Sequence, residues 1–296
     1  MSAQANPYLK LVTQFAGLLG QAQPLFPQRV APAPAVPASP DAPLCLICSP
    51  HPDDECIVGA LPLRLKREAG YRVLNLAITL GSKLERRAGR RQELRHACDY
   101  LGFELAVCGD DGFGGVSLAS RDADASAWQD KVAALAAVFT RHAPALLVFP
   151  HAADGSATHI GVHWLVRDAL QASGHACLTA QTEFWHPLAD PNLMLETSLA
   201  DTADLIAALA CHVGEVQRNP YHLRLPAWMA DNVRRGAEMI AGSGSTAPDY
   251  AFATLYRIAR WDGAAFGPAL PPALLGAADA LSGWLATASS GKPSPA

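Results

Sequence analysis

The sequence predicts an α/β fold: a Rossmann-like three-layer sandwich in which helices cover both faces of a mostly parallel sheet, followed by a mainly helical C-terminal part. From residue 44 to about residue 172, short apolar runs alternate with longer amphipathic segments, a pattern typical of parallel strands joined by helices. Of the 296 residues, 50% are hydrophobic and 17% are charged. This composition supplies enough apolar surface for a buried core and too little charge for a disordered chain.

The first regularly spaced segment is residues 9–19, ahead of this domain. Its apolar residues recur at helical intervals and predict an amphipathic helix that docks on another surface. They include Leu11, Phe15, Leu18 and Leu19. The alternative is the apolar core of a signal peptide. Gln14 inside the run and a weakly charged start, with Lys10 alone, argue against that alternative.

A proline-rich segment separates this helix from the domain. Residues 22–43 contain seven prolines among alanines, a composition that favours extended chain over helix or strand. We therefore expect a helix and Pro/Ala-rich linker over residues 1–43, one domain over residues 44–288, and a flexible tail over residues 289–296.

The domain begins with a strand, a helix and a second strand. Residues 44–48 (LCLIC) form a short apolar run between prolines, which is typical of a buried parallel strand. Residues 55–68 predict a helix that Gly70 ends, and residues 72–79 predict the next strand.

Helices and strands continue to alternate after this unit. Periodicity predicts strands over 105–108 and 145–149 and helices over 90–101, 127–141 and 159–172. After Trp185 the pattern favours helices, over 202–218, 227–241 and 273–286, with the apolar run 252–258 between the last two. Because parallel strands end at one edge of a sheet, polar residues that follow the strands are expected to meet there.

Charge and cysteine content exclude several classes of protein. With 27 acidic and 23 basic residues, the net charge of −4 provides no broad positive field for nucleic acid. No apolar run approaches the roughly 20 residues that span a bilayer. Seven scattered cysteines favour reduced thiols and a cytoplasmic location. Cys45 and Cys48 lie within a predicted strand, so we interpret them as core residues rather than a redox pair.

A cluster of polar residues follows the first strand. His51-Pro52-Asp53-Asp54-Glu55 places one imidazole and three carboxylates within five residues. Such a concentration beside a buried strand is normally compensated by a metal ion or by ion pairs. The alternative is a turn in which Asp53 or Asp54 only caps the following helix.

A second cluster follows the strand at 145–149. It supplies three further imidazoles, His151, His159 and His163. His159 and His163 stand four residues apart and would share one face of a helix, as in two-histidine metal sites. Alternatively, His163 simply packs beside Trp164.

These motifs resemble, in their order along the chain, those of the PIG-L/LmbE-like zinc-dependent de-N-acetylases. The resemblance extends from residue 44 to about His163. Its strongest element is the HPDDE motif at 51–55. The supporting elements are Thr79-Leu80-Gly81, Arg90, Glu93, Leu94, Leu101-Gly102, Asp111-Gly112 and the D-G-x-x-x-H stretch at 154–159.

The resemblance implies roles for individual residues. His51, Asp54 and His159 would bind Zn²⁺, and Asp53 would be the general base. Arg90 and, with weaker support, Asp111 would contact the substrate, an N-acetylglucosamine-type sugar or glycoconjugate. Arg90 could equally be a solvated helix residue.

The chemistry of this residue set agrees with those roles. Two imidazoles and one carboxylate leave a zinc coordination position open for water, as catalytic sites require. Zinc can lower the pKa of that water to roughly 7 and polarise an amide carbonyl, while a carboxylate accepts the proton. Fe²⁺ would accept the same ligands.

Two departures from the family pattern leave other functions open. Ser156 stands where the family usually has a histidine, and Thr254 stands where a C-terminal glutamate is usual. His151 or His163 could replace the missing imidazole. The alternatives are a non-catalytic carbohydrate- or partner-binding protein and an amide hydrolase for a different acyl substrate.

Overall fold

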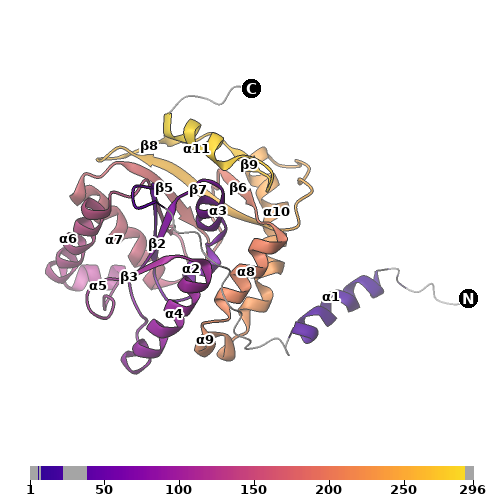
Figure 1. Cartoon of the computed structure of the whole chain (residues 1–296), viewed down its shortest axis with the longest axis horizontal. Coiled ribbons are helices and arrows are strands. Elements are labelled where there is room, and N and C mark those ends of the chain that lie inside the picture. The colour runs from indigo at the N-terminus through magenta and orange to yellow at the C-terminus, as the bar shows by residue number, and fades with distance from the viewer. Residues whose placement is uncertain (1–5, 7, 23–38, 291–296) are drawn as a thin grey trace, which may run out of the picture.

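The computed structural model describes residues 6, 8–22 and 39–290. A nine-stranded sheet lies at its centre, with strand order β3-β2-β1-β4-β5-β7-β6-β9 and β8 paired with β7 (Figure 1). The strands are β1 (Leu44–Ser49), β2 (Arg72–Ala77), β3 (Glu104–Val107), β4 (Leu146–Pro150), β5 (Cys177–Thr182), β6 (Leu193–Glu196), β7 (Ala253–Trp261), β8 (Phe266–Ala269) and β9 (Ala273–Leu275). The pairs from β3 through β5 are parallel, and β7 runs antiparallel to both β5 and β6.

Helices cover both faces of this sheet (Figure 1). They are α1 (Leu9–Ala22), α2 (Asp54–Ile57), α3 (Ala60–Glu68), α4 (Arg87–Leu101), α5 (Leu118–Ala123), α6 (Ala125–His142), α7 (Ala157–Ser173), α8 (Leu199–Leu209), α9 (Val213–Arg218), α10 (Leu225–Ala241) and α11 (Leu281–Ser290), with 3-10 turns η2 (Leu84–Arg86) and η3 (Tyr221–Arg224). Cys45 and Ile47 of β1 pack into a core with α3, α4 and α8. Leu46 and Cys48 point the other way, into a core with α6 and α7. This alternation, expected of a strand buried on both faces, confirms the predicted three-layer fold.

Three predicted helices have different bounds. The segment 55–68 forms two helices, α2 and α3, with Val58 and Gly59 between them. Gly59 packs closely against α8. A Cβ at Gly59 would lie 2.3 Å from Cδ2 of Leu205. The segment 202–218 is likewise divided between α8 and α9. The expected helix 273–286 is wrong over its first part, where residues 273–275 instead form β9 and pair with β6.

The N-terminal helix exists, but its apolar side chains are not covered by the domain. Leu11, Phe15 and Leu18 are 62%, 59% and 58% exposed, and α1 stands apart from the sheet in Figure 1. The expected linker falls mostly on residues 23–38, and the expected tail on residues 291–296, both outside the described residues.

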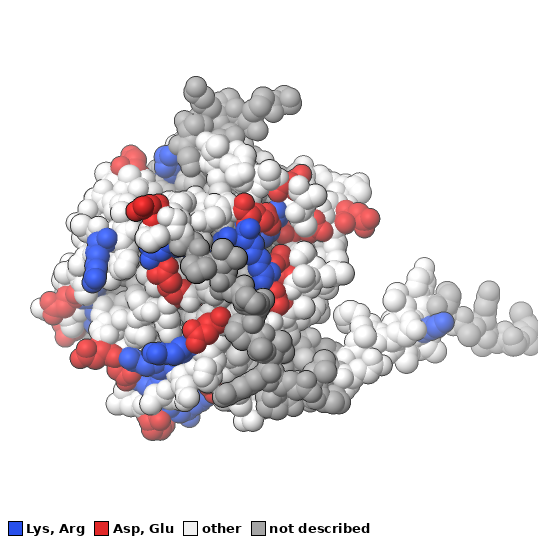
Figure 2. Space-filling view, viewed as in Figure 1, with Lys and Arg blue, Asp and Glu red and all other residues white. Residues whose placement is uncertain are grey.

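The two cysteines of the first strand are core residues, as predicted. Cys45 and Cys48 are buried on opposite faces of the sheet, and all seven cysteines are free. Burial raises the pKa of both thiols, so neither forms the reactive thiolate that redox chemistry needs. Basic and acidic side chains are interspersed on the face shown in Figure 2. Among the described residues, no helix has the length and apolar character of a membrane span.

Candidate metal centre

The loop after β1 brings His51 and Asp54 together. The backbone N–H of His51 donates to Oδ2 of Asp54 (2.8 Å), and that of Asp53 donates to Oε2 of Glu55 (3.0 Å). Asp53 takes φ 118°, a left-handed conformation that is unfavourable for residues other than glycine. The loop thus folds back on its own carboxylates, which hold Asp53 in this strained position.

His159 reaches the same point from the first turn of α7, the helix that follows β4 along the chain. Gly161 permits this because a Cβ there would lie 2.5 Å from the carbonyl oxygen of Val116. His159 is completely buried, and its Nδ1 lies 3.5 Å from Oδ1 of the buried Asp154. Asp154 also accepts the backbone N–H groups of Ser156 (2.9 Å) and Trp185 (3.2 Å). The carboxylate of Asp154 therefore lies at ion-pair distance from the imidazole of His159 and anchors the loop that carries Trp185 by its hydrogen bond to that residue.

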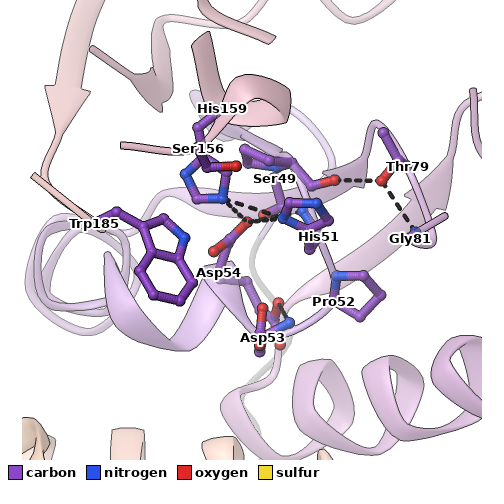
Figure 3. Close-up of polar contacts among 12 residues, drawn as sticks. Ser49, His51, Pro52, Asp53, Asp54, Thr79, Gly81, Ser156, His159 and Trp185 are labelled. Atoms are coloured by element: carbon purple, nitrogen blue, oxygen red, sulfur yellow. Dashed lines mark hydrogen bonds and ion pairs between the residues drawn. The ribbon is translucent and has the colours of Figure 1, made fainter. Parts of the chain in front are cut away.

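Three potential ligand atoms form a nearly equilateral triangle (Figure 3). His51 Nδ1 lies 3.1 Å from His159 Nε2 and 3.6 Å from Asp54 Oδ2, and the last two atoms are 3.5 Å apart. Zinc bonds of about 2.0–2.2 Å place neighbouring ligands of a tetrahedral ion about 3.3–3.6 Å apart. The triangle matches one face of that tetrahedron, so His51, Asp54 and His159 fit a divalent metal with the fourth corner open.

Electrostatics favour metal binding by the same three residues. Burial alone would raise the pKa of Asp54, but the imidazoles of His159 and His51 hold it below its ordinary value. Burial lowers the pKa of His159. The carboxylate is therefore charged and the buried imidazole neutral, which are the forms that bind metal.

Asp53 borders this triangle and has a different environment. Burial, and then the negative charge of Asp54, raise the pKa of Asp53 to about 7. The hydroxyl of Tyr221 donates to Oδ2 of Asp53 over 2.5 Å. Beneath the loop, Glu55 and His212 are fully buried and joined by a 2.7 Å contact between Oε1 and Nε2. This pair supports the loop through the bond from Glu55 to the backbone of Asp53.

Sequence reasoning missed Tyr221 and His212. Both come from the helical region after β6, more than 150 residues beyond Asp53. Neither lies in a recognisable motif, and the sequence carries no spacing signal for them. Only the packing of α8 beside α2, and of η3 beside α8, brings them to the site.

A cleft of about 730 Å³ opens over these residues. His51, Asp53, Asp54 and His159 line its inner end. Phe184 and Trp185 line another part, and Figure 3 shows the indole of Trp185 beside the ligand atoms. Residues after β2 and residues between α9 and η3 complete the walls.

The structure separates the two predicted substrate contacts. Arg90 lines the cleft, and its Nη2 donates to the carbonyl oxygen of Pro52 over 3.2 Å. Gly81 takes φ 90°, a backbone conformation that residues with a Cβ rarely adopt, which explains the glycine of the T-x-G turn. Asp111 is exposed, lies 3.3 Å from Arg91, and is not among the residues that line the cleft.

The residues at the two departures also differ in position. Ser156 lines the cleft at the start of α7, whereas Thr254 is buried in β7 opposite Leu195 and does not line it. His151 and His163 contact backbone carbonyl groups, at 2.9 Å in each case, and neither lines the cleft. The described structure therefore does not place either imidazole where it could replace the missing histidine.

Comparison with known proteins accounts for the motif-bearing part of the chain. Residues 46–170 match the family model described as GlcNAc-PI de-N-acetylase, PIG-L. This part of the chain is similar to the PIG-L family, and we refer to residues 46–170 as the PIG-L segment. The PIG-L segment contains the three potential ligands and Asp53. The cleft residues Glu215, Arg218 and Tyr221 lie outside it. No curated protein sequence matches the chain significantly.

Solved structures share the fold at low sequence identity. A conserved protein from Thermus thermophilus is 19% identical, with a TM-score of 0.55 over 73% of this chain and 93% of that one. N,N'-diacetylchitobiose deacetylase from Pyrococcus horikoshii is 15% identical, with a TM-score of 0.54 over 88% and 95%. The 4-carboxy-2-hydroxymuconate hydratase from Pseudomonas putida is 18% identical, with a TM-score of 0.54 over 73% and 95%. Because a deacetylase and a hydratase share this fold, the function must be argued from the site.

Proposed function

We propose that this protein is a metal-dependent hydrolase that removes the N-acetyl group from an N-acetylglucosamine-type sugar or glycoconjugate. The observation that most directly supports this proposal is the triangle of potential ligand atoms from His51, Asp54 and His159. Asp53 lies beside it, and all four residues line an open cleft. The PIG-L segment supports a de-N-acetylase. Zn²⁺ is the proposed metal, with Fe²⁺ as the alternative. The free thiols support the further proposal of a cytoplasmic location.

The residues around the triangle divide the chemistry between them. When bound, the metal supplies polarisation of the amide carbonyl and a lowered pKa for water. Asp53 accepts the proton of the attacking water and returns it to the leaving nitrogen. Tyr221 holds Oδ2 of Asp53 by its hydroxyl, which leaves Oδ1 for this proton. Asp154 keeps Nε2 of His159 directed at the metal by its contact with Nδ1.

The wall beside the triangle supports the sugar substrate that the family resemblance implies. Trp185 is 71% exposed although it lines the cleft. An exposed indole in a cleft offers a flat apolar surface with a polar N–H at its edge, which suits the C–H face of a sugar ring. The neighbouring Phe184 packs edge-on against His159, with ring centroids 4.7 Å apart. A sugar lying on Trp185 would therefore have its N-acyl group close to the metal ligands.

Acetate release tests this proposal directly. We expect the protein loaded with one equivalent of metal to release acetate from a chitobiose or N-acetylglucosaminide probe. Asp53→Asn should abolish release and retain the metal, and His159→Ala should lose the metal. Metal content well below one equivalent in the parent would overturn the metal centre. Tight sugar binding with a full metal site and no acetate release would favour the non-catalytic carbohydrate-binding alternative.

A further inference from the structure

One wall of the cleft gathers positive charge. Lys83 and Arg86 come from the segment between β2 and α4, and Arg218 ends α9. These two segments are more than 130 residues apart in the sequence, yet all three side chains line the cleft. Arg90, from α4, lines the cleft as well. The wall therefore presents four cationic side chains to the cleft.

A single carboxylate stands among these cations. Glu215 is almost fully buried and lies 2.7 Å from Nη2 of Arg86 and 3.6 Å from Nε of Arg90. Its other oxygen, Oε2, pairs with Nη2 of Arg218. Burial would raise the pKa of Glu215, but the nearby guanidinium groups hold it below its ordinary value. One negative charge is thus shared among three arginines, and the wall keeps an excess of positive charge.

The outer cations retain donors that face the cleft. The side chain of Arg218 is 70% exposed and that of Arg86 is 34% exposed. Lys83 is exposed, and its side chain makes no hydrogen bond or ion pair with any described residue. Glu93, another acid near this wall, accepts the backbone N–H of Gly214 over 2.9 Å and does not line the cleft. A network that only stabilised the fold would not need this excess of positive charge.

The surplus lies close to the proposed reaction. Arg90 contacts the carbonyl oxygen of Pro52, next to Asp53. Tyr221, three residues after Arg218, reaches the carboxylate of Asp53. A substrate with its amide at the metal triangle could therefore extend an anionic substituent to this wall. Guanidinium and ammonium groups bind phosphate and carboxylate oxygens through strong charge-assisted hydrogen bonds.

We propose that Lys83, Arg86 and Arg218 form an anion subsite that binds a phosphate or carboxylate carried by the amino sugar, away from its acetyl group. This inference rests on the proposed function for the position of the amide. It adds a substrate class, the negatively charged N-acetyl amino sugars. Neutral glycosides would fill the inner end of the cleft and leave this wall without a partner.

Calorimetric binding to metal-loaded Asp53→Asn protein tests the subsite without turnover. The probes are N-acetylglucosamine 1-phosphate and 6-phosphate, N-acetylmuramic acid as the carboxylate, and methyl N-acetylglucosaminide as the neutral reference. We expect at least one anionic probe to bind about tenfold or more tightly than the neutral one, with a preference that weakens as salt is added. The phosphates and the carboxylate are compared to identify the anion.

Charge-removing variants locate the preference. Arg218→Gln and Lys83→Gln should each reduce it by about tenfold or less while leaving binding of the neutral probe unchanged. Arg234→Gln is the matched control, because Arg234 is exposed on α10 and pairs only with Asp231 in the described structure. Equal affinity for all probes, no binding of any anionic probe, or an equal loss in the Arg234 variant would overturn the subsite.

The outcome is separable from that of the proposed activity. Preferential binding of an anionic probe without acetate release by the protein that retains Asp53 would leave the subsite standing and refute the deacetylase. Acetate release with the same KM for neutral and anionic probes would refute the subsite and leave the deacetylase standing.

Discussion

Replacing Tyr221 by phenylalanine removes the hydroxyl that donates to Oδ2 of Asp53 and leaves the aromatic ring in place. The bond is 2.5 Å long and its acceptor is a carboxylate. Hydrogen bonds to charged groups contribute about 1.5–3 kcal/mol. If this bond orients the general base in the transition state, its loss corresponds to a decrease in kcat of about 10- to 150-fold.

The assay is acetate release at saturating substrate, with metal content and KM measured on the same preparations. We expect kcat to fall while metal content and KM stay near the parent values, because Tyr221 contacts the base and none of the three ligand atoms. Tyr100→Phe is the matched control. Its hydroxyl also donates to an aspartate, Asp204, over 2.9 Å, and Tyr100 does not line the cleft. A kcat within twofold of the parent, or an equal loss in the Tyr100 variant, would refute the positioning role.

Three further substitutions test other parts of the site and fold. Asp154→Asn should weaken metal affinity by about 10- to 100-fold, as competition with a chelator would measure, because the amide supports His159 less well; unchanged affinity would contradict this. Trp185→Ala should raise KM for a sugar substrate and change the free energy of unfolding by no more than about 0.5 kcal/mol, since the side chain is 71% exposed; an unchanged KM would remove the indole from the sugar site. Burial lowers the pKa of His163 from 6.5 to about 4, so the unfolded chain takes up a proton first and stability is lost as pH falls from 6.5 to 4. His163→Gln should reduce that loss by up to roughly 3 kcal/mol in denaturant titrations, and parallel pH profiles for the two proteins would contradict it.

The residues at the metal triangle could be predicted because the fold places them by a local rule. His51, Asp54 and His159 each follow a strand closely, and the carboxyl ends of neighbouring parallel strands meet at one edge. β1 and β4 are such neighbours. The pattern of apolar runs followed by polar residues predicted that the two clusters meet, and the family resemblance indicated which of their residues would bind a metal.

The part of the cleft wall that α9 and η3 form could not be predicted from the sequence, for a physical reason. Glu215, Arg218 and Tyr221 lie on a helix end and a 3-10 turn whose position depends on contacts between distant helices. Gly59, at the break between α2 and α3, also packs against a side chain far along the chain, Leu205 of α8. A pattern read along a short window contains periodicity and capping signals but no such long-range contacts.

The cleft is assembled from two stretches of chain that carry different tasks. The PIG-L segment supplies all three potential ligand atoms of the triangle, whereas residues 215–221 supply part of the wall of the cleft. Substitutions in those few residues can alter what enters the cleft without moving a ligand atom. The chain is thus suited to engineering by exchange of one short segment of the cleft wall, with metal content as a constant reference across a library of such exchanges.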